Sequence, residues 1–197
     1  MKRLHFSFKQ IVTYIFALLC ITRASPDKLS LVISFPFIMC GELIRVWGTG
    51  HLRKNKTVVT SGPYSYIRDP LYLGTLLIST GFTIAGRTWE LLVIVWAVFF
   101  LYYMPYKRKR EGDRLSSMFG KTYDDYRKEV RSLIPRLKPY KGADYNNRWS
   151  AKLVKENSEV GIIVLVIVWF LLLVIKMLWF KHMVFPKYDI SKIFNLT

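Results

Sequence analysis

The chain has 197 residues, of which 52% are hydrophobic and 16% aromatic, and it carries a formal net charge of +17. This composition excludes an ordinary soluble domain, and the long apolar runs disfavour a nucleic-acid-binding protein, which needs its basic face on a soluble scaffold. We therefore expect a membrane, and no nucleic acid, to be the partner of the basic residues. Because the chain has no internal repeat and no low-complexity linker, we expect a single membrane domain over residues 1–197.

The first two apolar runs predict membrane helices. Residues 4–22 follow a basic N-terminus and could form a signal peptide, but Arg23 and Pro26 make a poor cleavage site. We therefore expect a retained helix there. A second helix is predicted over residues 29–46.

Glu42 and Arg45 lie three residues apart near the end of the second run, so both can lie on one face of a helix. A carboxylate inside a membrane helix is costly unless it is paired or faces a polar cavity. The residues leave two interpretations open, a structural ion pair between Glu42 and Arg45 or a functional site.

Residues 47–69 are expected to form a polar, basic loop. Gly48 and Gly50 in this loop could approach a phosphate or a cofactor, although the signal is weak because no strand precedes them. The next apolar runs, 71–86 and 89–104, are separated by only two residues and predict a tight helical hairpin.

Residues 107–155 are polar and contain an apolar stripe at helical spacing, which predicts an amphipathic helix on the membrane surface. The stripe consists of Leu115, Phe119, Tyr123, Tyr126, Val130 and Leu133. Gly120 is a candidate interruption, and Pro135 is expected to end the helix. Residues 160–180 are the clearest transmembrane run, and its single charged residue, Lys176, can extend toward the far interface.

These elements predict an all-α, integral-membrane bundle of about five transmembrane helices with a cytoplasmic amphipathic helix. If the N-terminus lies inside, most of the 30 Lys and Arg residues fall in the inner segments. Because basic loops stay on the cytoplasmic side, we expect both polar segments, and any site that they form together, to face the cytoplasm.

Neither a disulfide framework nor a metal site is expected. Cys20 and Cys40 both lie in apolar runs, where a thiol usually behaves as a small hydrophobic group. His5, His51 and His182 are scattered singly, without the paired spacing of metal ligands.

The least ordinary segment is 61–74, a polar loop that runs directly into an apolar helix. It reads Gly62-Pro63-Tyr64, then Arg68-Asp69-Pro70-Leu71-Tyr72-Leu73-Gly74. Its two prolines restrict the backbone, and its glycines permit close approach of another group. The simplest interpretation is a turn with an interfacial aromatic anchor.

After the hairpin, a second group of residues follows at fixed order: Glu111, Leu115, Phe119-Gly120, Tyr123, Tyr126 and Pro135. With both groups in this order, residues 41–135 resemble the integral-membrane methyltransferases of the isoprenylcysteine carboxyl methyltransferase and phospholipid N-methyltransferase superfamily. The resemblance implies that S-adenosylmethionine is held between the two groups on the cytoplasmic side.

The resemblance also implies roles for individual residues. Arg68 and Glu111 would be catalytic. The cofactor-binding residues would be Tyr64, Arg68, Asp69, Pro70, Tyr72, Gly74 and Glu111. Arg68 could pair with the cofactor carboxylate, and we expect it to keep Asp69 ionised. Two positions depart from the family pattern, because Asp69 replaces the usual histidine and Gly112 replaces a usual second glutamate.

The activity that the resemblance implies is that of an S-adenosylmethionine-dependent methyltransferase, isoprenylcysteine carboxyl methyltransferase-like, acting on a lipid or lipidated substrate. The lack of a histidine base beside the motif favours a carboxylate acceptor, because an ethanolamine-type ammonium must first lose a proton. A phospholipid (ethanolamine) N-methyltransferase stays open, and so does a non-catalytic membrane protein that retains the scaffold. The sequence indicates no oligomeric state.

Overall fold

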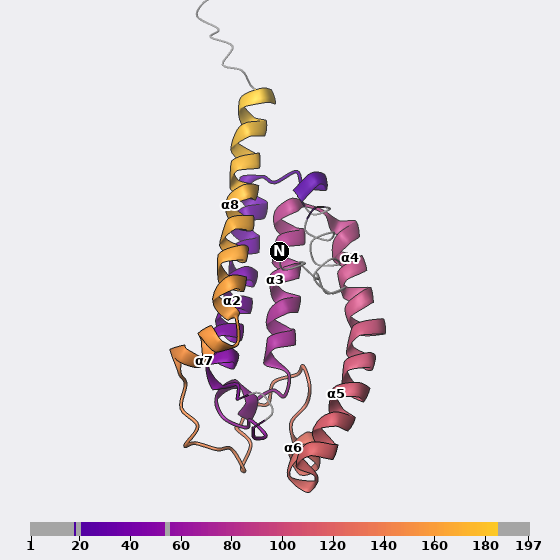
Figure 1. The fold of residues 1–197 in the computed structure, drawn as a ribbon. Coiled ribbons are helices and arrows are strands. Elements are labelled where there is room, and N and C mark those ends of the chain that lie inside the picture. Colours follow the sequence, from indigo (N-terminus) through magenta and orange to yellow (C-terminus); the bar gives the residue numbers. More distant parts are fainter. Residues whose placement is uncertain (1–17, 19–20, 54–55, 185–197) are drawn as a thin grey trace, which may run out of the picture.

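The structure, a computed structural model, describes residues 18, 21–53 and 56–184 (Figure 1). Within these residues the backbone forms helices and loops and no strand, which confirms the all-α prediction. The long helices lie side by side in an elongated bundle (Figure 1). The helix predicted over residues 4–22 lies almost wholly outside the described residues.

Helix α2 (Lys28–His51) begins with a capping box. The backbone N–H of Ser30 donates to the Asp27 side chain over 2.7 Å, and the Ser30 hydroxyl accepts from the Asp27 N–H. The helix extends one turn beyond the predicted end at residue 46, so the predicted loop begins too early.

The glycines in this last turn serve helix packing, which corrects the expectation that they approach a phosphate or a cofactor. A Cβ atom on Gly48 would lie 3.0 Å from Leu71, and one on Gly50 would lie 1.9 Å from the Trp149 ring. The space at Gly50 is therefore filled by Trp149, and a side chain on Gly48 would be in tight contact with Leu71.

Helices α3 (Pro70–Gly86) and α4 (Trp89–Ala97) form the predicted hairpin. Its turn is closed by Arg87, which has a φ of 55° and donates to the Asp27 carboxylate over 2.9 Å. Helix α3 packs against α2 at small residues, since a Cβ on Gly41 would lie 2.7 Å from the Gly74 carbonyl oxygen.

Helix α4 continues through a π-helical turn, η2 (Val98–Tyr103), into α5 (Met104–Phe119). The prediction that the second hairpin helix ends at residue 104 is therefore wrong. The π turn ends two residues before Pro105, which has no N–H and whose ring conflicts with regular helical geometry. Because the widened turn does not break the helix, the polar residues of α5 continue directly from the apolar residues of α4.

The amphipathic stripe is divided between two helices. Gly120, with a φ of 54°, separates α5 from α6 (Lys121–Glu129), as expected for an interruption. The helix ends at Glu129 and not at Pro135, so Val130 and Leu133 lie in the following loop. The stripe still predicts burial, because Tyr123, Tyr126 and Val130 form one buried cluster.

Two C-terminal helices complete the described chain, α7 (Ala151–Glu156) and α8 (Glu159–Val184). Helix α8 runs alongside α2 (Figure 1) and packs Trp169 edge-on against Phe82 of α3. The predicted transmembrane helix over 160–180 is thereby confirmed as a helix. Lys176 donates to the carbonyl oxygen of Ile21 over 2.6 Å.

Arg45 pairs with α8, so the ion pair between Glu42 and Arg45, one of the two interpretations of these residues, does not form. The Arg45 guanidinium donates to both carboxylate oxygens of Glu159, over 2.7 and 2.9 Å. Glu42 is not its partner. The Glu42 carboxylate oxygens are buried and have no hydrogen-bond partner among the described residues.

Among the residues that the structure describes, three helices are long and apolar enough to cross a membrane: Lys28–His51, Trp89–Phe119 and Glu159–Trp179. Pro70–Gly86 is a shorter apolar helix between them. The α3–α4 turn lies at one end of the bundle, whereas α6, α7 and their loops lie at the other (Figure 1). The two polar segments therefore meet at the same end.

Candidate functional site

A cavity of about 400 Å³ lies between the loop after α2, the start of α3, and helices α5 and α6. Arg68 and Glu111, from the two sequence motifs, both line it, so the expected meeting of the motifs is confirmed. Its volume falls within the range of small-molecule sites. Its lining residues are Leu52, Arg53, Thr57, Val58, Val59, Tyr64, Arg68, Asp69, Pro70, Leu71, Tyr72, Glu111, Arg114, Leu115, Phe119, Tyr123 and Tyr126.

The first motif is built on a short 3₁₀ helix, η1 (Gly62–Ser65). Gly62 has a φ of 56°, and a Cβ there would lie 2.3 Å from the His51 ring, so this position requires glycine on both counts. The turn directs Tyr64 inward, where burial raises the pKa of its hydroxyl. The Tyr126 hydroxyl donates to the Tyr64 carbonyl over 2.7 Å and so joins α6 to the motif.

Tyr72 and Glu111 connect the two motifs directly. The Tyr72 hydroxyl donates to a Glu111 carboxylate oxygen over 2.9 Å. Tyr72 lies in the first turn of α3, and its ring packs edge-on against Tyr103 at 5.5 Å. Because α5 continues the membrane helix without a break, Glu111 reaches the level of the α3 N-terminus.

Arg68 has structural contacts in addition to its place in the cavity. Its guanidinium donates to the carbonyl oxygens of Arg127 and Val130, over 3.2 and 3.4 Å, and so caps the end of α6. The backbone N–H of Arg68 also donates to the Arg131 carbonyl over 2.9 Å. The side chain is about one-tenth exposed. Arg68 therefore fixes α6 and the following loop against the motif.

Asp69 lies at the N-terminus of α3, with a carboxylate oxygen 3.6 Å from Arg68 Nε. The Ser132 hydroxyl donates to this carboxylate. Burial raises the pKa of Asp69, and although Ser132 and Arg68 act against this shift, they do not reverse it. Desolvation is therefore the larger effect on this pKa, and the attraction of Arg68 opposes it.

Most of the residues predicted to bind a cofactor surround this one cavity. The lining includes Tyr64, Arg68, Asp69, Pro70, Tyr72 and Glu111. Gly74 lies elsewhere, in the contact between α2 and α3, where a Cβ would lie 2.4 Å from Arg45 Cγ. Its place in the motif reflects helix packing.

Several lining residues were missed from the sequence. Tyr123 and Tyr126 belong to the apolar stripe, whose spacing indicated burial but not a cavity wall. Arg53 and Arg114 also line the cavity, and nothing in the sequence distinguishes them from the many other basic residues. Their role depends on how the loops fold around the motifs.

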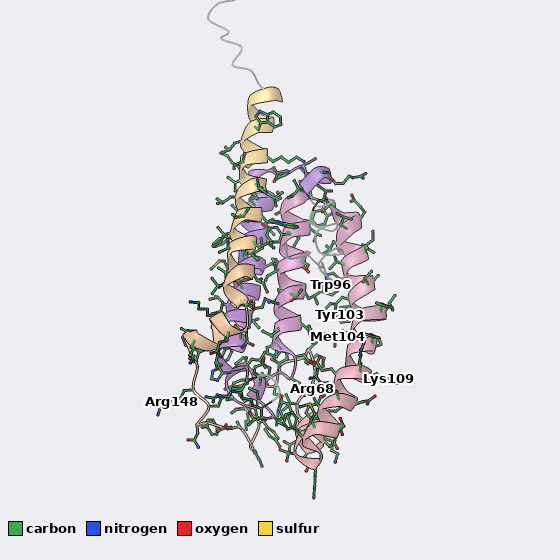
Figure 2. The ribbon with its side chains drawn as sticks, in the orientation of Figure 1. Arg68, Trp96, Tyr103, Met104, Lys109 and Arg148 are labelled. Carbon is green, nitrogen blue, oxygen red and sulfur yellow. The ribbon has the colours of Figure 1, made fainter. Side chains whose placement is uncertain are left out.

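A second cavity of about 780 Å³ lies beside the first, between α5 and the loop after α6. Arg68, Met104 and Lys109 line it, and Figure 2 shows Arg68 and Met104 between α3 and α5. Its lining residues are Arg68, Phe100, Met104, Pro105, Lys109, Asp113, Arg127, Arg131, Ser132, Leu133 and Ile134. Arg68 borders both cavities, and a small pocket that includes Arg68, Met104 and Glu111 lies between them.

Residues 29–122 match the phospholipid methyltransferase family. This segment, a little under half of the chain, is thus similar to integral-membrane methyltransferases. The match runs from α2 to the start of α6 and includes the first motif and the second motif from Glu111 to Gly120, which confirms the resemblance inferred from the sequence. Helices α7 and α8 lie beyond it.

Two curated proteins are similar to this chain. The cobalt-zinc-cadmium resistance protein CzcN of Cupriavidus metallidurans is 29% identical over 142 residues, which cover 68% of this chain and 65% of that protein. A protein-S-isoprenylcysteine O-methyltransferase of Dictyostelium discoideum is 33% identical over 93 residues, which cover 43% of this chain and 35% of that enzyme. The alignments thus span less than two thirds of either relative. No solved structure matches significantly.

Proposed function

We propose that this protein is an S-adenosylmethionine-dependent membrane methyltransferase that acts on a lipid or lipidated acceptor. The observation that carries the proposal is the cavity that residues of both motifs line, most of them within the segment that matches the phospholipid methyltransferase family. A second cavity that shares Arg68 with the first supports an acceptor site next to the cofactor.

The residues around the first cavity fit S-adenosylmethionine by their chemistry. Tyrosine rings suit the adenine and, through cation–π contact, the positive sulfur. The carboxylates of Asp69 and Glu111 suit the ammonium and the ribose hydroxyls, and Arg53, Arg68 and Arg114 provide positive charge for the carboxylate. No group of metal-ligating side chains occurs in the part of the chain that the structure describes.

When bound, S-adenosylmethionine supplies an electrophilic methyl group on a positively charged sulfur. The Tyr72 hydroxyl holds the Glu111 carboxylate in place, so that its negative charge faces the cavity. Arg68 caps α6 and thereby keeps the α6 tyrosines in the wall, which excludes water. The protein would act mainly by positioning its two substrates, because a carboxylate acceptor needs no general base.

The second cavity favours an acceptor that is apolar at one end and anionic at the other. Its apolar wall contains Phe100, Met104, Leu133 and Ile134. Four basic residues and only one acidic residue, Asp113, also line it. A positive potential attracts a carboxylate and repels an ammonium group, so we favour carboxyl methylation over ethanolamine N-methylation.

The test is transfer of a radiolabelled methyl group from S-adenosylmethionine by the purified full-length protein in lipid nanodiscs supplied with a membrane lipid extract. We expect label in the organic phase that mild alkali releases as volatile methanol, as it does from a methyl ester and not from an N-methyl group. Glu111→Gln should abolish the transfer. Label that alkali does not convert to methanol would favour the amine acceptor, and no label from a protein that binds S-adenosylhomocysteine would favour a non-catalytic scaffold.

A further inference from the structure

The first cavity, which we propose for the cofactor, is lined by an arginine that the sequence motifs did not predict. Arg68, the residue that the motif suggests for the cofactor carboxylate, already caps the end of α6 and lies next to Asp69. Arg53 lies on a different wall, directly after the last turn of α2, and also lines the cavity. The two arginines therefore differ in whether their hydrogen-bond donors are available to a ligand.

Asn147 fixes the orientation of Arg53. The Arg53 Nε–H donates to the Asn147 side-chain oxygen over 2.8 Å. The Asn147 amide nitrogen donates to the His51 carbonyl over 3.0 Å and to the Ser61 hydroxyl over 2.8 Å. Because these acceptors engage the nitrogen, the amide can present only its oxygen to Arg53.

Burial makes this arrangement rigid. Asn147 is 8% exposed, and its backbone carbonyl oxygen lies 3.0 Å from His51 Nδ1. His51 in turn packs against Gly62 at the start of the first motif. Asn147 therefore connects the end of α2, the motif loop and Arg53, although it lies outside the segment that matches the methyltransferase family.

The geometry leaves one edge of the Arg53 guanidinium for a ligand. Asn147 uses the Nε–H, and the guanidinium forms no other hydrogen bond or ion pair with the described residues. The two terminal nitrogens can then form the paired hydrogen bonds that a carboxylate accepts. Glu111, on α5, supplies the negative charge that the ammonium of the same amino acid group requires.

We infer that Arg53 binds the carboxylate of the cofactor's amino acid group and that Asn147 is the positioning residue that holds Arg53 there. This inference rests on the proposed function. It assigns to Arg53 the role that the family resemblance suggested for Arg68, and it makes the loop between α6 and α7 a part of the cofactor site.

The experiment compares two ligands on the detergent-purified full chain, S-adenosylhomocysteine and 5′-methylthioadenosine. Both contain the adenosine and the thioether, but the second lacks the amino acid carboxylate. Arg53→Gln should weaken S-adenosylhomocysteine binding by about 10- to 100-fold and leave 5′-methylthioadenosine binding nearly unchanged. Arg53→Lys keeps the charge without the paired hydrogen bonds, so its loss should be smaller.

Arg148→Gln is the matched control, because Arg148 follows Asn147 directly, is exposed and lies at the periphery of the bundle (Figure 2). It should bind both ligands as the wild type does. An equal loss of both ligands in Arg53→Gln would overturn the inference, and so would unchanged S-adenosylhomocysteine binding. If the wild type binds neither ligand, the proposed function itself fails.

A double-mutant cycle tests the positioning role of Asn147. Asn147→Ala should weaken S-adenosylhomocysteine binding in the wild type but have no further effect in the Arg53→Gln background. Its effect on the unfolding temperature should be the same in both backgrounds. Equal losses of affinity in both backgrounds would show that Asn147 acts independently of Arg53 and would contradict the inference.

Discussion

At the scale of single residues, Asp69 combines a cost in stability with a place in the cavity. Burial raises its pKa, so its protonated form is favoured in the folded state. Its contribution to stability is present below the pKa of the unfolded chain, about 4, and is lost as the pH rises through the raised value. At neutral pH Asp69 therefore makes the fold less stable than it is near pH 4.

Asp69→Asn should separate this cost from ligand binding. Because the amide carries no charge and its oxygen can still accept from Ser132, the unfolding temperature at pH 7 should exceed that of the wild type. The difference should vanish near pH 4. Affinity for S-adenosylhomocysteine should fall by about tenfold as a charge-assisted hydrogen bond is lost. Thermal unfolding in detergent at both pH values checks the prediction, and a lower unfolding temperature at pH 7 would contradict it.

The sequence predicted that the two motifs form one site, but it did not predict the role of each residue in that site. Tyr72 and Glu111 were expected in one site because of their order in two motifs, and a hydrogen bond joins them. Arg53 and Asn147 carry no such signal, because they are 94 positions apart and lie among other polar residues. Their contact follows only from the path of the loop after α6.

At the scale of helices, the ion pair between Arg45 and Glu159 holds α8 against α2. The side chains are 11% and 1% exposed, so removal of one partner leaves a buried charge uncompensated. Glu159→Gln should reduce the free energy of unfolding by about 3 kcal/mol, at the lower end of such losses. Replacing both residues, as Arg45→Met with Glu159→Leu, should recover much of the loss. Denaturation of the purified variants measures this, and a fully stable Glu159→Gln protein would contradict it.

Contact between α2 and α3 depends on glycine. Gly41→Ala should destabilise the fold, because the new Cβ would lie 2.7 Å from a backbone oxygen of α3, which cannot move away easily. The matched control is Gly161→Ala in α8, where the added Cβ would meet no heavy atom within 4 Å apart from its chain neighbours and the backbone of its own helix. The unfolding temperature should fall for Gly41→Ala and stay the same or rise slightly for Gly161→Ala. Equal effects would contradict the role of close helix packing.

The apolar runs of the sequence predicted the helices, but they did not predict where three of the helices begin or end. Helix α2 continues to His51 because its glycines pack against neighbours that only the fold brings close. Helix α5 continues α4 because a π turn precedes Pro105, and local sequence rules predict a break there. Helix α6 ends at Glu129 because the loop after it pairs with the backbone of residues 65–69.

At the scale of the whole molecule, the polar segments meet at one end of the bundle (Figure 1), and we propose that this end faces the cytoplasm. Cysteine labelling in a background with Cys20→Ser and Cys40→Ser tests the orientation. Lys141→Cys should react from the inner side and Glu90→Cys, in the first turn of α4, from the outer side. Reaction of both from one side would contradict the proposed topology. Lys187, an alternative outer position, lies outside the described residues.

The central claim is that the cavity between the two motifs binds S-adenosylmethionine. Equilibrium binding of S-adenosylhomocysteine to the detergent-purified full chain, compared with Glu111→Gln, tests it most directly. We predict saturable binding at one site per chain and a loss of about tenfold or more when the Glu111 carboxylate is replaced. The absence of saturable binding, or equal affinity of the wild type and Glu111→Gln, would contradict the claim.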